Sequence, residues 1–164
     1  MALRNETFWL GLMLQGVDPI MAEGAFRLMA LARPKAMHPK GPPSKPVPVV
    51  FDVARDAGHI LYKADADTHG RQAPMSKRPQ DFQSERAERV PWIAEVLADP
   101  DAVYSDKKEP ERFTYLCWTL AGEQFAVIIE NRPGKVEKSF VTAFVIDPEL
   151  WRRKRLRFKK TYTK

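Results

Sequence analysis

The hydrophobic pattern of this chain changes its period near residue 100. Over residues 82–98 the apolar side chains share one face at helical spacing, and the four clearest positions are Val90, Ile93, Ala94 and Leu97. Pro91 lies inside this pattern, so we expect either a kinked helix or one that restarts at the proline. Beyond residue 100 the period is two, which is typical of half-buried strands. The change predicts an α+β fold.

Four apolar segments after this point predict the strands of a sheet. They are residues 102–104, 112–120, 125–129 and 140–146. The second alternates, with Phe113, Tyr115 and Cys117 on one face and Leu116 and Trp118 on the other. Short turns join these segments, so we expect a four-stranded antiparallel meander with the N-terminal helices packed on it.

The first half of the chain predicts a helical appendage and a linker. Residues 1–33 have the pattern of two helices, with Asp18 and Pro19 as the N-cap and first position of the second. Residues 34–48 hold six of the 14 prolines and predict an extended linker, with a docking peptide as the alternative. We therefore expect an appendage at 1–33, a linker at 34–48, a main domain at 49–150 and a tail at 151–164.

The positive charge of the chain is concentrated at its C-terminal end. The net charge is +6, and residues 151–164 hold eight basic and no acidic residues, so the rest has 19 basic against 21 acidic residues. Such a segment suits a phosphate backbone, an acidic partner or an anionic membrane. Trp151, Leu156 and Phe158 alternate with its cations, which favours single-stranded nucleic acid over a membrane. A solvated basic end is the plain alternative.

The cysteine count and the motifs of the sequence limit the kinds of catalytic, cofactor and metal site that we expect. Cys117 is the one cysteine and lies in an apolar strand pattern, so we expect a core residue rather than a catalytic thiolate. The absence of cysteine pairs and of a leader sequence favours the cytoplasm. The chain has no P-loop, no HExxH and no Cys/His cluster with ligand spacing, so we expect no cofactor and no metal.

Three segments together resemble a known family. They read ERVPWIAEVLADPDAVYSD (88–106), RFTYLCWTLAGEQFAVIIE (112–130) and SFVTAFVID (139–147), with HILYK and a following Asp-Thr-His upstream. The pattern resembles the phage-associated branch of the barnase–EndoU–colicin E5/D–RelE-like (BECR) nuclease superfamily over roughly residues 57–147. The resemblance implies metal-independent RNA cleavage by 2′-hydroxyl attack, leaving a 2′,3′-cyclic phosphate. It also implies a phage or toxin protein acting in a bacterial cytoplasm.

The reaction that the resemblance implies needs an acid, a base and groups that hold the phosphate. His69 is the first candidate for acid or base, and His59 is either its partner or a structural residue. Arg89 matches the helix arginine of the family and is expected to bind phosphate, while Thr142 is expected to donate one hydrogen bond. An ordinary solvated histidine, a surface salt-bridge cluster and a strand-forming threonine are the plain alternatives.

Further residues are expected to bind substrate rather than to react with it. Phe140 and Phe144 are expected beside Thr142 on one face of the last strand, where their rings can stack on bases. The other candidates are Arg86, Arg112, Tyr115, Arg152, Arg153, Arg155, Arg157 and Lys159.

Two rival functions stay open at this stage. A BECR-like sheet without catalysis could bind RNA or a protein, as a phage-encoded inhibitor of a host nucleic-acid or defence complex would. The chain could also be a structural module that docks on a phage head protein through its helical N-terminus. RNA is the expected partner in the first case, and a host complex, immunity protein or phage head protein in the others.

Overall fold

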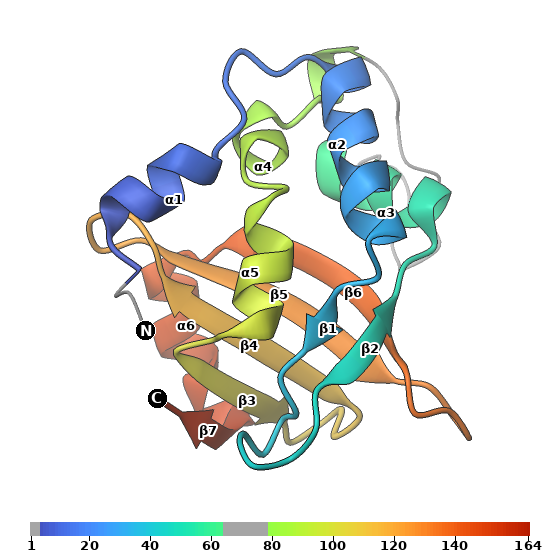
Figure 1. The fold of residues 1–164 in the computed structure, drawn as a ribbon. Helices are drawn as coiled ribbons and strands as arrows, with labels where there is room; N and C mark the ends of the chain where they lie inside the picture. The colour runs from blue at the N-terminus through green and yellow to red at the C-terminus, as the bar shows by residue number, and fades with distance from the viewer. Residues whose placement is uncertain (1–3, 64–78) are drawn as a thin grey trace.

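The computed structural model describes residues 4–63 and 79–164 and shows a helical layer on one side of a curled sheet (Figure 1). The sheet has seven strands in the order β1-β2-β6-β5-β4-β3-β7. Neighbouring strands are antiparallel except β2 and β6, which are parallel. The chain is α+β, but its sheet is mixed and wider than the sequence pattern predicts.

Helices begin and end where local chemistry requires. The α-helices are α1 (Glu6–Leu12), α2 (Pro19–Leu31), α3 (Val53–Leu61), α4 (Ser84–Glu88), α5 (Trp92–Ala98) and α6 (Pro148–Lys154), with 3₁₀ turns η1 (Pro79–Asp81) and η2 (Arg155–Arg157). Asp18 caps α2 by accepting from the Met21 amide at 2.8 Å. Pro91 separates α4 from α5, so the helix restarts there rather than kinking.

The four predicted strands are all present, and three more join them. The strands are β1 (Lys35–Ala36), β2 (Val47–Val50), β3 (Ala102–Asp106), β4 (Arg112–Trp118), β5 (Gln124–Asn131), β6 (Lys138–Val145) and β7 (Phe158–Thr163). The predicted four-stranded antiparallel sheet is therefore wrong. β1 and β2 are too short to show alternation in the sequence, and β7 is an edge strand whose lysines mask its pattern.

One aromatic core holds the helices to the sheet. Trp9, Trp92 and Phe125 are almost fully buried, and the Trp92 ring meets the Trp9 ring at 5.3 Å and the Phe125 ring at 5.4 Å, both edge to face. The Trp92 indole Nε1 donates to the Trp9 carbonyl at 3.0 Å. Each buried ring contributes roughly 2–3 kcal/mol by apolar burial. The cluster also includes Ala36, Met37 and Val47, so residues 34–48 are a packed part of the fold rather than a plain spacer.

Candidate nucleic-acid interface

The two faces of the sheet have different surroundings. The core face carries Tyr115 and Val127, which belong to the main hydrophobic cluster under α1–α5. The outer face carries Leu116 and Ala126, which form a second, smaller cluster with Ile146. Figure 1 shows α6 on this outer side, across the sheet from α5. The sheet thus separates a large closed core from a thinner outer layer.

The predicted basic tail folds back as α6, η2 and β7 and completes this outer layer. β7 pairs with β3 along its length, with one register shift between Val103 and Tyr104. Trp151 of α6 packs its ring on Tyr104 at 5.3 Å, edge to face, and stacks on Phe158 at 5.1 Å. The segment therefore forms a structured surface, and the prediction of a basic tail outside the sheet is wrong.

Half of its eight basic residues are held by acidic groups. Arg157 pairs with Asp106 at 2.5 Å and with Glu109 at 3.5 Å, and Lys164 pairs with Asp99 at 2.8 Å. Burial alone would raise the pKa of Asp106, but the Arg157 guanidinium and two backbone amides outweigh it and lower that pKa. These pairs anchor η2 and the end of β7.

Two further pairs involve the helix itself. Arg152 and Arg153 both reach Glu149, at 2.6 and 3.8 Å, on the exposed side of α6. Exposed pairs of this kind contribute little to stability, so these guanidinium groups can still exchange partners.

The other four cations of this segment lack an acidic partner within the described chain. They are Lys154, Arg155, Lys159 and Lys160, all exposed. The Lys160 ammonium lies 5.7 Å from the centre of the Tyr104 ring, and no ion pair joins any of the four to a residue in 4–63 or 79–164. We call these four side chains the basic strip. Its charges are available to an external anion.

A cavity of about 210 Å³ lies beside the basic strip, between α6 and the outer face of the sheet. Thr114, Ile128 and Phe144 line it from the strands. Trp151, Lys154, Arg157 and Phe158 line it from the C-terminal segment, together with Leu150 and Asp147. It is a mainly apolar cavity with cationic groups at its border.

Arg89, the predicted phosphate-binding arginine, is used inside the fold. It is 6% exposed, and its Nε and Nη2 donate to the two carboxylate oxygens of Glu123 at 3.1 and 3.2 Å. Its Nη1 donates to the Glu85 carbonyl at 2.8 Å, and the guanidinium lies 5.1 Å from the centre of the Trp92 ring. These contacts hold α4 to the β4–β5 turn.

Thr142 and Arg89 lie on opposite sides of the sheet. Thr142 pairs with Ile128, which lines the outer cavity, whereas the next residue, Ala143, belongs to the core. Arg89 packs on Trp92 in the helical layer. The two groups are therefore not brought together around one phosphate.

A β-bulge separates the two phenylalanines that were expected on one face. Thr142 pairs with Ile128 but Phe140 pairs with Ile129, so Val141 is the extra residue in β6. Phe140 is 1% exposed and stacks in the core, while Phe144 lines the outer cavity. The expectation that Phe140 flanks Thr142 on a common face is wrong, because the bulge shifts the alternation by one residue.

The structure describes one of the two candidate histidines. His69 lies outside the described residues. His59 is exposed on α3, and desolvation followed by the positive charges of Arg86 and Arg55 lowers its pKa. Arg86 is half-buried on α4, where burial lowers its pKa. His59 and Arg86 are thus neighbours, and Arg86 also lines a pocket with Phe144 and Val145 of β6.

Arg112 and Tyr115 serve the fold. Arg112 pairs with Glu109 at 2.7 Å and with Glu130 at 3.1 Å. Tyr115 is fully buried, and its hydroxyl donates to the Met37 carbonyl at 2.5 Å. Burial raises the pKa of this phenol above its usual range, so it is not placed to relay protons.

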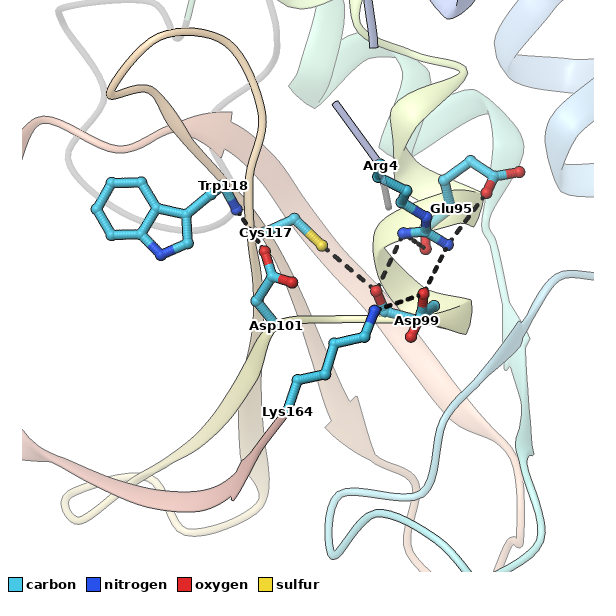
Figure 2. A network of polar contacts seen from close by, with 7 residues as sticks. All are labelled: Arg4, Glu95, Asp99, Asp101, Cys117, Trp118 and Lys164. Carbon is cyan, nitrogen blue, oxygen red and sulfur yellow. Dashed lines mark hydrogen bonds and ion pairs between the residues drawn. The ribbon is translucent and has the colours of Figure 1, made fainter. Parts of the chain in front are cut away.

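A polar network joins both ends of the described chain to α5 (Figure 2). Arg4 donates to the carbonyls of Glu95 and Asp99 at 3.0 Å each, and Lys164 pairs with the same Asp99. Cys117, 1% exposed, places its Sγ 3.5 Å from the Asp99 carbonyl. Burial raises the pKa of this thiol to about 12, so Cys117 is a core residue as predicted.

Among the residues described, no cluster of three or more His, Cys, Asp or Glu side chains could hold a metal ion. The helices of the described ranges are all too short or too polar to cross a lipid bilayer.

Sequence reasoning missed Thr114, Lys154 and the cavity that they line. In the sequence Thr114 has the pattern of an ordinary half-buried strand threonine. It lines a cavity only because α6 folds back over the outer face of the sheet. The interleaved aromatic residues Trp151 and Phe158 were the available signal, and they point inward rather than along a free tail.

Comparison of the chain with protein-family models, with curated proteins and with solved structures found no match.

Proposed function

We propose that this protein binds single-stranded nucleic acid, with RNA as the first candidate, through the outer face formed by α6, η2 and β7. The observation that carries the proposal is the basic strip, four exposed cations without an acidic partner in the described chain. They lie on α6, η2 and β7, so the backbone that carries them is already folded and binding has to order only the side chains.

The charge pattern supports a phosphate backbone as the ligand. Cations that neutralise phosphates release condensed counterions, and this sequence-independent term supplies much of nucleic-acid affinity. The strip's cations come from α6, η2 and the adjacent edge strand, where Lys160 lies on the outer face and Lys159 on the opposite one, so they are spread over a surface rather than gathered in one pocket. Cations spread in this way suit an extended polyanion better than one small anion.

An exposed indole supports a single strand over a duplex. Trp118 is 57% exposed at the end of β4, and its indole points away from the polar network in Figure 2. By alternation it lies on the same sheet face as Leu116, which is the outer face. A solvent-facing ring on the same face of the sheet as α6 can stack on an unpaired base.

Ribonuclease activity, which the family resemblance implies, stays a separate hypothesis. Among the described residues its proposed phosphate ligands, Arg89 and Thr142, lie on opposite sides of the sheet. Binding without cleavage is therefore the function that the geometry favours.

One experiment tests binding and cleavage together. A labelled single-stranded RNA is titrated with the protein in EDTA at several salt concentrations, followed by fluorescence anisotropy, and the RNA is then recovered and its ends analysed. We expect binding with a log–log salt slope of about −3, as four phosphate contacts give at roughly −0.7 each, and intact RNA. No binding at low salt would contradict the proposal. Cleavage to 2′,3′-cyclic phosphate that is lost in His69→Ala would favour the ribonuclease instead.

A second candidate function rests on α2. Four large apolar side chains of this helix are exposed, Ile20 at 84%, Met21 at 52%, Leu28 at 71% and Leu31 at 67%. Exposed apolar side chains gathered on one helix suit a protein-docking site, as the head-docking hypothesis expects. Pull-down with phage head proteins, comparing wild type with Leu28→Glu, tests it. Capture of no head protein by the wild type would contradict it.

A further inference from the structure

We infer that the cavity beneath α6 is a subsite for one unpaired nucleobase of the bound strand. The inference rests on the proposed nucleic-acid binding and adds where a base is held and by which groups. The cavity of about 210 Å³ adjoins the basic strip, since Lys154 belongs to both. A strand whose phosphates follow the strip can therefore turn one base inward.

The walls of the cavity are aromatic and already ordered. Trp151 stacks on Phe158 with 26° between the ring planes, and Tyr104 closes on Trp151 edge to face. Phe144 and Ile128 form the opposite wall on the sheet. These rings are already held by neighbouring rings, so they lose little conformational freedom when a planar ligand enters the cavity. Such walls favour a flat heterocycle.

A threonine hydroxyl without a hydrogen-bond partner among the described residues borders the cavity. Thr114 is 4% exposed and lines the cavity, and its hydroxyl makes no hydrogen bond to any residue within 4–63 or 79–164. Among the described residues the buried side-chain polar atom without a partner is Trp9 Nε1, in the core, so the Thr114 hydroxyl is reached through the cavity rather than sealed. Because a hydroxyl both donates and accepts, it can bond the polar edge of any base.

The charges at the border of the cavity favour an anion outside it rather than inside. Asp147 lines the cavity, but its carboxylate caps α6 by accepting from the Glu149 and Leu150 amides at 2.8 and 3.1 Å. Arg157 is held by Asp106. Lys154 is the border cation with no ion pair to a described residue. Lys154 is therefore the border group left to pair with a phosphate outside the cavity, while the apolar walls receive an aromatic body.

The test separates the base from the backbone. Fluorescence anisotropy compares three probes of equal charge and length at one salt concentration: a single-stranded RNA, a single-stranded DNA and an abasic strand. We expect the base-bearing strands to bind about tenfold more tightly than the abasic strand, since stacking one base contributes roughly 1–3 kcal/mol. Free mononucleotide is included as a competitor, because it carries the same chemistry.

Two variants place the effect in the cavity. Thr114→Val removes the hydroxyl and keeps the shape, and we expect it to weaken the RNA about fivefold and to leave the abasic strand unchanged. Thr119→Val is the matched control, because Thr119 is equally buried but does not line the cavity. We expect it to change neither affinity, and thermal unfolding confirms that both variants fold.

The outcomes distinguish this inference from the proposed function. Equal affinity for RNA and the abasic strand, with Thr114→Val without effect, would overturn the base subsite while leaving backbone binding intact. Failure of every strand to bind would overturn both. Tight binding of mononucleotide with no preference for the strand, or displacement of RNA by an uncharged aromatic peptide as readily as by RNA itself, would also overturn the subsite.

Discussion

The two faces of the sheet are built on opposite principles. On the core face the aromatic rings are fully buried and Trp92 donates its indole hydrogen bond to the Trp9 carbonyl. On the outer face one short helix covers the strands only in part, and a cavity with an unpaired threonine hydroxyl is left between them. The core face is closed by packed rings, although Trp9 Nε1 is left there without a hydrogen-bond partner, whereas the outer face keeps an accessible cavity.

The basic side chains repeat the same contrast. Arg4 and Arg89, on the helical side, each meet a carboxylate and a backbone carbonyl. Lys154, Arg155 and Lys160, on the other side, meet no acidic group within the described residues. A cation's role therefore follows from whether the fold supplies its counter-charge, which residue type alone does not reveal.

Neutralising the basic strip should have the largest effect. Replacing Lys154, Arg155, Lys159 and Lys160 by Gln should weaken single-stranded RNA about 1,000-fold at low salt, at roughly 1 kcal/mol for each charge contact. The salt slope should fall close to zero. The measurement is anisotropy across a salt series.

The matched control changes the same charge elsewhere. Lys35, Lys40, Lys45 and Lys135 are exposed and lie outside the C-terminal segment, and replacing all four by Gln should reduce affinity by less than about tenfold. Equal losses in the two quadruple variants would show that net charge, not the outer face, governs binding.

Gly41 lies against the ring of Tyr162 in the edge strand β7. It has a φ of +73°, and a Cβ there would overlap the ring of Tyr162, the β7 residue that packs toward the core. Gly41→Ala should lower the free energy of unfolding by about 3 kcal/mol, from a left-handed backbone and the overlap together. Gly16→Ala, at φ +56° with open space around it, should cost only about 1 kcal/mol. Denaturant titration compares them, and similar losses would mean that this contact does not hold β7.

Asp56, a buried carboxyl on α3, should make the stability of the protein depend on pH. It is 2% exposed, and burial raises its pKa from 3.8 to about 6 despite hydrogen bonds from Arg55 and the Asp52 amide. A raised carboxyl pKa means that its stabilising contribution is present below the unfolded value and is lost as pH rises through the folded value. Over that window the loss is about 3 kcal/mol.

The Asn variant isolates this window. Replacing Asp56 by Asn removes the titration, so the unfolding free energy of Asp56→Asn relative to wild type should rise by about 3 kcal/mol between pH 4 and pH 7. Chemical denaturation at both pH values measures it. A constant difference between the two proteins would contradict the raised pKa.

The smallest expected effect is that of Thr114→Val on the free energy of unfolding. Because its hydroxyl borders the cavity and has no hydrogen bond to a described residue, Thr114→Val should change the free energy of unfolding by less than about 0.5 kcal/mol in the absence of ligand. Thr119→Val should lower it slightly, because the Thr119 hydroxyl lies 3.5 Å from the Glu123 carbonyl. A larger loss of stability in Thr114→Val would show that this hydroxyl is already satisfied.

The sequence was sufficient for regular local structure. Alternation in Arg112–Trp118 placed Tyr115 and Cys117 on one face and Leu116 on the other, as the structure has them, although Tyr115 was expected to bind substrate and is a core residue. The Asp18–Pro19 pair located the start of α2. Both patterns depend on neighbours in the chain, and such neighbours are visible in the sequence.

The misses all depend on contacts between distant residues. Val141 forms a bulge that reverses the side of Phe140, and no local feature announces it. Arg89 became a structural residue because Glu123, far along the chain, meets it. The sequence predicts a tail here because β7 is an edge strand, and its exposed lysines take the place of an alternating apolar pattern.

The most direct test of the outer face as the binding surface is amide chemical-shift mapping with a single-stranded RNA. The account predicts that the shifts which change belong to α6, η2, β7, Thr114 and Trp118, and that α2 and α3 stay unchanged. Changes centred on His59 and Arg86 in α3 and α4, with the C-terminal segment silent, would contradict it.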